Sequence, residues 1–209
     1  MNKFFAFLVA VFFHGQIDAQ KIFSEGVIKY DVYVNQLDKP EGIYIVTVKN
    51  GFIKRELVMN SGFNNIIFYN HKTGITTSLN VDQGNKYALE MSAAEVQAKN
   101  SRFNKAVFTP TNDKKKFAGY SSTSSKVQYT NGESALFYYT TDLLPPNESF
   151  NIMFPNLQGI PLEYEVKSNE TTTIKFVATQ VETKSIDSKI FDIPKDYKIV
   201  TQQELQQIK

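Results

Sequence analysis

Residues 127–140 read VQYTNGESALFYYT, and this stretch decides the fold class. Asn131-Gly132 separates two β-prone runs, which predicts a hairpin with a type I′ turn and φ > 0 at both residues. A two-residue loop pairs Val127 with Leu136 and places large apolar side chains on both faces of the hairpin. Both faces of a central strand pair in a folded-over sheet are buried in this way.

Short strands continue on both sides of this hairpin. Residues 109–116 hold Pro110 and three consecutive lysines, and they predict a polar loop. Period-two runs bounded by tight turns predict strands over residues 27–34, 43–49, 52–59, 63–70, 75–79, 86–91, 161–167 and 171–183. The spacing predicts an antiparallel meander.

Two helix starts carry a capping box. Ser92 with Glu95 predicts a helix from Ser92 to about Phe103, and Thr201 with Glu204 predicts a short helix at the end of the chain. Residues 150–157 are apolar but contain Pro155, which predicts a short helical turn or loop.

Composition bounds the class of protein. The chain has 209 residues, 42% of them hydrophobic, a formal net charge of +2 and no cysteine. This charge predicts no nucleic-acid partner, and the lack of cysteine excludes disulfides and thiolate metal sites. No repeat or linker divides the chain, so residues 20–209 are predicted to form a single β-rich domain.

The first 19 residues predict a secretory signal peptide. Lys3 is followed by an unbroken apolar run over residues 4–13 and a more polar segment that ends at Ala19. The apolar run is shorter than the roughly 20 residues that cross a bilayer. The expectation is cleavage before Gln20 and a periplasmic or secreted protein without a transmembrane anchor.

Residues that could perform catalysis are scarce. His71 is the one histidine after the expected cleavage, and no Gly-x-Ser-x-Gly, phosphate-binding or dinucleotide motif is present. One histidine without cysteine does not make a common zinc site. Glu163 and Glu165 share a strand face, and a solvent-facing face is the commoner setting for such a pair. The sequence therefore predicts no enzyme, no cofactor and no metal.

Aromatic residues are the more informative group, with 17 Phe and 11 Tyr. Core packing explains many of them, because aromatic residues favour sheets. A curved sheet that encloses an apolar ligand is the functional alternative. In that arrangement the helix that starts after Ser92 lies in the concave side, and the predicted ligand-binding residues are Phe68, Val96, Phe103, Phe137, Tyr139, Phe154 and Leu157.

Three segments carry a family resemblance: residues 117–120 (FAGY) with the hairpin that ends in Tyr138-Tyr139-Thr140, residues 157–166 (LQGIPLEYEV), and residues 191–197 (FDIPKDY). They resemble an uncharacterised exported family of Gram-negative bacteria, similar to the GLPGLI-type family and to a related domain of unknown function. Ser121 and Ser122 stand where members often carry a cysteine. The resemblance implies a LolA-like half-barrel, a strongly curved antiparallel sheet with one or two helices against its concave face.

These observations predict a non-enzymatic exported protein that shelters an apolar small molecule, lipid or acyl chain. The alternative is an envelope interaction or structural module that docks a protein partner and holds no small ligand.

Overall fold

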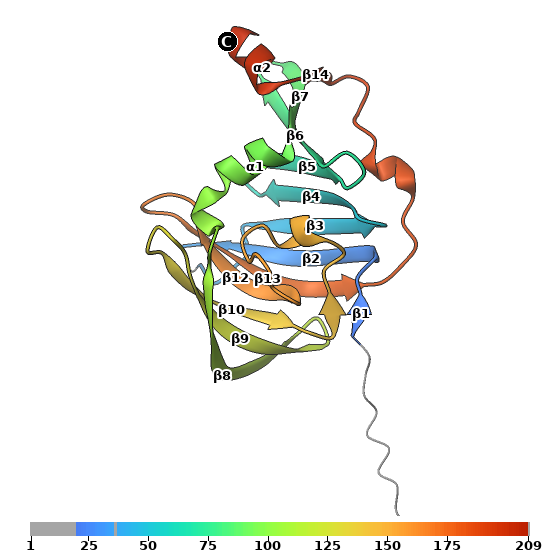
Figure 1. Ribbon diagram of the computed structural model, residues 1–209. Helices are drawn as coiled ribbons and strands as arrows, with labels where there is room; N and C mark the ends of the chain where they lie inside the picture. The colour runs from blue at the N-terminus through green and yellow to red at the C-terminus, as the bar shows by residue number, and fades with distance from the viewer. Residues whose placement is uncertain (1–19, 36, 209) are drawn as a thin grey trace, which may run out of the picture.

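A computed structural model describes residues 20–35 and 37–208, so the expected signal peptide lies outside the described residues. The described chain is mainly β (Figure 1). Its strands are β1 (Lys21–Ile22), β2 (Glu25–Val34), β3 (Gly42–Lys49), β4 (Phe52–Met59), β5 (Asn64–Asn70), β6 (Ile75–Asp82), β7 (Asn85–Met91), β8 (Val107–Phe117), β9 (Tyr120–Gln128), β10 (Ser134–Thr140), β11 (Leu143–Leu144), β12 (Ile160–Lys167), β13 (Thr173–Glu182) and β14 (Lys198–Val200). The helices are α1 (Ala93–Lys99), α2 (Gln202–Ile208) and the 3₁₀ turns η1 (Ser101–Phe103), η2 (Glu148–Asn151) and η3 (Ser188–Phe191).

Twelve strands form one curved, open sheet in the order β14-β7-β6-β5-β4-β3-β2-β13-β12-β10-β9-β8. The predicted meander is confirmed from β2 to β7. The chain then crosses from β7 to the opposite edge through α1 and η1, and returns from β8 to β13. Antiparallel pairing of β13 with β2 joins the two halves of the sheet. The curved antiparallel sheet predicted from the sequence is therefore present.

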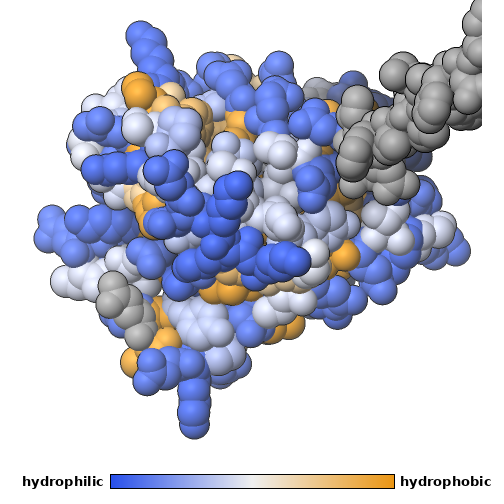
Figure 2. Space-filling view, turned by 90° about the horizontal axis from the view of Figure 1, so that it is seen from below, coloured by the Kyte–Doolittle hydropathy of each residue, from blue (hydrophilic) through white to orange (hydrophobic). Residues whose placement is uncertain are grey.

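The predicted loop over residues 109–116 is wrong, because this segment belongs to the edge strand β8. Its ladder with β9 is irregular between Pro110 and Lys114. Proline, lysines and bulges are the features that protect an edge strand from pairing with another chain. Figure 2 shows the molecule from the side of β8 and β9, and most side chains on this face are hydrophilic.

The hairpin of residues 127–140 forms as β9 and β10, but it lies beside the edge strand β8 and not at the centre of the sheet, and its register differs from the prediction by one residue. Ala135 pairs with Val127, and Phe137 pairs with Ser125. Of the two turn residues only Gly132 has positive φ, and its N–H donates to the Tyr129 carbonyl oxygen. This is a three-residue loop with a type I turn and a glycine bulge. The shift turns Phe137 to the buried side, where it is fully enclosed.

Both predicted capping boxes are confirmed. The Glu95 amide donates to the Ser92 hydroxyl at 3.3 Å, and the Glu204 amide donates to the Thr201 hydroxyl at 3.3 Å. However, α1 is shorter than predicted and buries none of its residues. Its half-buried Val96 packs against a small cluster of Tyr87, Leu89, Met91 and Val200.

A segment that contains the short 3₁₀ turn η2, and not the helix α1, fills the centre of the concave face. Residues 145–159 follow β11 and cross in front of β2 and β3 (Figure 1). Phe154 from this segment is 3% exposed, stacks on Phe137 with ring centroids 4.4 Å apart, and meets Tyr164 edge-on at 5.5 Å. Aromatic pairs with this geometry add to the apolar burial that holds the segment down. We call residues 145–159 the cover segment.

The opposite, convex face is packed by the return of the chain after β13. Ile193 and Tyr197 lie against Phe68, Leu79 and Ala88. This packing places Phe68 on the other side of the sheet from the cover segment.

Candidate ligand cavity on the concave face

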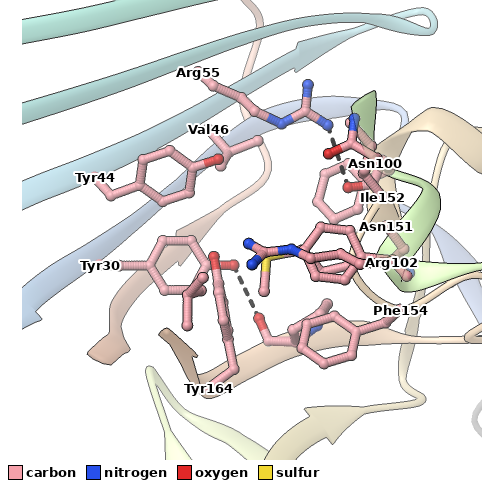
Figure 3. Close-up of a pocket in the computed structure, with 15 residues that line it drawn as sticks. Tyr30, Tyr44, Val46, Arg55, Asn100, Arg102, Asn151, Ile152, Phe154 and Tyr164 are labelled. Carbon is pink, nitrogen blue, oxygen red and sulfur yellow. Dashed lines mark hydrogen bonds between the residues drawn. The ribbon is translucent and has the colours of Figure 1, made fainter. Parts of the chain in front are cut away.

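A cavity of about 280 Å³ lies between the concave face and the cover segment (Figure 3). Its walls come from β2, β3, β4 and β12 on one side, and from Asn100, η1 and the cover segment on the other. The lining residues are Tyr30, Tyr44, Val46, Arg55, Asn100, Arg102, Phe103, Phe150, Asn151, Ile152, Met153, Phe154, Pro161, Tyr164 and Val166. Aromatic walls with a few polar groups are typical of small-molecule sites.

Strand alternation explains why these sheet residues meet. Val46 pairs with Arg55, and Tyr44 lies two residues before Val46 on the same face of β3. Tyr30 pairs with Tyr44 across β2 and β3, and Tyr164 pairs with Phe176 on β13. The residues come from strands far apart in sequence, and the pairing of β13 with β2 brings them together.

Three tyrosines form the floor of the cavity. The Tyr30 hydroxyl donates to the Pro161 carbonyl oxygen at 2.9 Å, and the Tyr30 ring meets the rings of Tyr44 and Tyr164 at 5.7 and 6.0 Å. Burial raises the pKa of all three hydroxyls above the ordinary tyrosine value. All three hydroxyls are protonated at neutral pH, as those of ordinary tyrosines are, and can donate hydrogen bonds.

Arg55 reaches from β4 to the cover segment. Its Nη2 donates to the carbonyl oxygens of Ser149 and Phe150 at 2.7 and 3.2 Å. These partners are neutral, and among the described residues no carboxylate lies within 4.0 Å of the Arg55 guanidinium group. The positive charge is thus half-buried beside the cavity without a close counter-charge.

Arg102 enters the cavity from the other wall. Its guanidinium carbon lies 4.7 Å from the centre of the Phe103 ring, which is cation–π distance. Its Nη1 is 3.9 Å from a Glu133 carboxylate oxygen, at the limit of an ion pair. In Figure 3 the Arg102 side chain extends toward the floor formed by Tyr30 and Tyr164.

Two further cavities adjoin the first. One of about 250 Å³ shares Arg102, Phe103, Met153 and Val166 with it. The other, of about 480 Å³, lies beneath α1 and shares Asn100, Asn151 and Ile152. The space between α1, the cover segment and the sheet is therefore wider than the central cavity alone.

The structure brings together some of the predicted ligand-binding residues. Phe103 and Phe154 line the central cavity. Phe137 and Tyr139 lie one layer behind, since Phe137 stacks on Phe154 and on Tyr139. Leu157 packs against the same core, where Phe154 is buried.

Two predicted residues lie elsewhere. Val96 lines the neighbouring cavity under α1, because the chain between α1 and Phe103 turns as a separate 3₁₀ segment. Phe68 pairs with Lys54 and Thr77, on the face opposite to Tyr69 and Arg55. Phe68 and Val96 therefore do not line the central cavity, and the Phe103 ring meets the Tyr129 ring at 5.1 Å.

Sequence reasoning missed Tyr30, Tyr44, Arg55, Arg102 and Tyr164. One signal was available: Arg55 and Arg102 are the only arginines in a chain with 23 basic residues. Nothing in the sequence showed that the two lie at one site, because 46 residues separate them.

Neither a metal cluster nor a membrane-spanning helix is found within residues 20–35 and 37–208. No group of three or more His, Cys, Asp or Glu side chains lies close enough to hold an ion there. No helix in this part of the chain is long and apolar enough to cross a bilayer.

Comparison with known proteins gives matches among solved structures alone, since no family model and no curated sequence matches. PNGF-II matches with TM-score 0.51 and 16% identity, over 87% of this chain and 32% of PNGF-II. The lipoprotein LppX of Mycobacterium tuberculosis matches with TM-score 0.40 and 8% identity, over 78% of this chain and 89% of LppX.

A LolA superfamily protein of Nitrosomonas europaea matches with TM-score 0.35 and 9% identity, over 84% of this chain and 94% of that protein. The chain thus spans about a third of PNGF-II and most of the two smaller proteins. At these identities the likeness concerns the fold alone. Membership of the exported family suggested by the sequence stays a prediction, and the chain is similar in architecture to PNGF-II over most of its length.

Proposed function

We propose that this protein is a non-enzymatic, exported binding protein that shelters a small ligand with an apolar body between its curved sheet and its cover segment. The observation that carries the proposal is the aromatic cavity under the cover segment. Phe154 and Tyr164 form walls there, and the cover segment is held by Arg55. An apolar ligand gains about 25 cal/mol for each Å² of apolar surface that leaves water.

The chemical groups of the central cavity suit binding. Its described lining holds aromatic rings, aliphatic groups, tyrosine hydroxyls, asparagine amides and guanidinium groups. These groups donate hydrogen bonds and pack. A nucleophile paired with a general base would be needed for hydrolysis, and the lining contains neither serine nor histidine.

A fluorescence titration tests the proposal. N-Phenyl-1-naphthylamine is a neutral apolar dye whose emission rises when it leaves water. We expect the dye to bind the wild-type protein at micromolar concentration. Val166→Phe places a ring into the space that Val166 lines, so this variant is expected to lose dye binding at least about tenfold, which corresponds to about 1.4 kcal/mol.

Val58→Phe is the matched control, because Val58 is 39% exposed and pairs with Ile43, on the convex face. It makes the same chemical change away from the cavity and should bind the dye as the wild type does. Thermal unfolding checks that both variants fold. If the wild type binds no dye, or if both variants bind equally, the proposal is overturned in favour of a module that docks a protein partner.

A further inference from the structure

Both arginines of the chain line the same cavity. All other basic residues of the sequence are lysines, and no lysine is among the lining residues of the central cavity. Arg55 comes from β4 and Arg102 from η1, so the two approach from opposite walls. Arginine differs from lysine in its planar fork of donors, which matches the two oxygens of a carboxylate or phosphate.

The cavity has positive charges without an equal number of negative ones. Its described lining contains no aspartate or glutamate. Glu133, the nearest carboxylate to Arg102 at 3.9 Å, lies in the wall of the neighbouring cavity. Two like charges facing one half-buried space repel each other, and a bound anion relieves this repulsion.

Tyrosine hydroxyl groups around the cavity add hydrogen-bond donors to the two guanidinium groups. The hydroxyls of Tyr44 and Tyr164 are protonated at neutral pH, as those of ordinary tyrosines are, and burial raises their pKa further. The two guanidinium groups, the tyrosine hydroxyls and the asparagine amides surround the space as hydrogen-bond donors, and Val46, Met153 and Phe154 add apolar surface between them. This combination suits a molecule with an anionic end and an apolar body.

Resting on the proposed function, we propose that the ligand is an anionic amphiphile whose carboxylate or phosphate group binds between Arg55 and Arg102. Its apolar body lies against Phe154, Met153 and the tyrosine floor. Carboxylate and phosphate groups both present paired, negatively charged oxygens. A carboxylate would belong to a free fatty acid, and a phosphate would belong to a phosphate ester of an alkyl chain.

A purely structural role for Arg55 is the competing explanation. Arg55 donates to the carbonyl oxygens of Ser149 and Phe150, so it holds the cover segment whether or not an anion binds. Arg102 has no hydrogen bond to that segment among the described contacts. Loss of anion binding in an Arg102 variant is therefore not explained by a loosened cover segment.

The experiment measures displacement of N-phenyl-1-naphthylamine by three amphiphiles with the same ten-carbon chain: decanoate, decyl phosphate and decyltrimethylammonium. We expect at least one of the two anions to displace the dye at a concentration about tenfold or more below that of the cation, as charge-assisted hydrogen bonds predict. The better anion identifies the head group.

Arg102→Gln should bring the anion and the cation within about threefold of each other, each displacement being referred to the dye affinity of that variant. Arg55→Gln should do the same and should also weaken binding of the neutral dye, because Arg55 holds the cover segment. Lys114→Gln is the matched control, because it removes one charge from an exposed position on β8. It should leave the preference for anions unchanged.

The outcomes separate the two proposals. If the dye binds but the three amphiphiles displace it equally, the anionic ligand is ruled out and the apolar binding function stands. The same conclusion follows if Arg102→Gln keeps the full preference for anions. If the dye does not bind the wild type, the binding function itself is overturned, and the anionic ligand with it.

Discussion

Gly51 and Gly132 have the same backbone φ of +85°, and each follows an asparagine in a hairpin. Their surroundings differ. A β-carbon on Gly51 would lie 2.8 Å from the His71 ring, whereas a β-carbon on Gly132 would meet no atom within 4 Å. The pair therefore separates the cost of backbone strain from the cost of a side-chain clash.

Gly132→Ala is expected to lower the free energy of unfolding by roughly 1–2 kcal/mol, the cost of left-handed backbone for an L-residue. Gly51→Ala should lower it further, because the His71 ring stacks edge-on against Phe52 at 5.2 Å and must move. Urea unfolding of both variants measures the difference. Equal losses would mean that the ring moves without cost, and an unchanged midpoint for Gly132→Ala would contradict the strain argument.

The two Asn-Gly turns differ in type, and the reason lies in the packing of single residues. Asn50 and Gly51 both have positive φ and close a two-residue loop between Lys49 and Phe52, as a type I′ turn requires. At residues 131–132 the longer loop shifts the register and buries Phe137. Packing of Phe137 on Phe154 outweighs the local preference of the dipeptide.

At the scale of elements, the segment after β13 is tied to the start of β2. The Ile186 amide donates to the Glu25 carboxylate at 2.7 Å, and the Lys49 ammonium donates to the same carboxylate oxygen at 3.0 Å. These contacts lower the pKa of Glu25 below its ordinary value of 4.5, the hydrogen bond from Ile186 contributing most. The ionised form is therefore the one that holds the segment.

Because the pKa in the folded protein is lowered, this contact stabilises fully above about pH 4.5 and is lost as the pH falls through the lowered value. We expect the Ile186 amide to lose protection against hydrogen exchange on acidification, after correction for the intrinsic rate. The Glu25→Gln side chain keeps an oxygen that can accept the hydrogen bond but has no carboxylate to titrate. In this variant the protection of the Ile186 amide should therefore not change on acidification. A wild type without this loss would contradict the assignment.

The cover segment, whose regular structure is limited to the 3₁₀ turn η2, decides where the cavity lies. The sequence predicts α1 as the element that fills the concave face, but the cover segment takes this place and α1 lies toward the β7 edge. The reason is steric and topological: α1 begins directly after β7 and is only seven residues long, so it cannot reach the centre of the sheet. The large apolar side chains of the cover segment, Phe154 above all, reach it from β11.

At the scale of the whole molecule, the chain is expected to be exported and cleaved before Gln20. The motivation is the order of a basic start, an apolar run and a small residue at position 19. N-terminal analysis of the protein recovered from the periplasm or the medium measures the cleavage site. A protein that still begins with Met1, or one found only in the cytoplasm, would contradict the exported binding function.

Features that depend on neighbours a few residues apart can be predicted from the amino-acid sequence alone. These are the strands of the N-terminal meander, the turn at Asn50-Gly51 and the two capping boxes at Ser92 and Thr201. Each rests on alternation, positive φ or a side chain that reaches a backbone amide three residues away. Interactions between residues this close in the chain can be predicted from the order of the amino acids.

The pairing of β13 with β2, the register of the β9–β10 hairpin and the presence of Arg55 and Arg102 at one cavity depend on the tertiary fold. Each of these depends on which large side chains fill one enclosed space, and the side chains that meet there are more than a few residues apart in the sequence. A one-residue shift exchanges the two faces of a strand, so packing of Phe137 and Phe154 selects among registers that are locally similar in energy. The cavity and its charge follow from that selection.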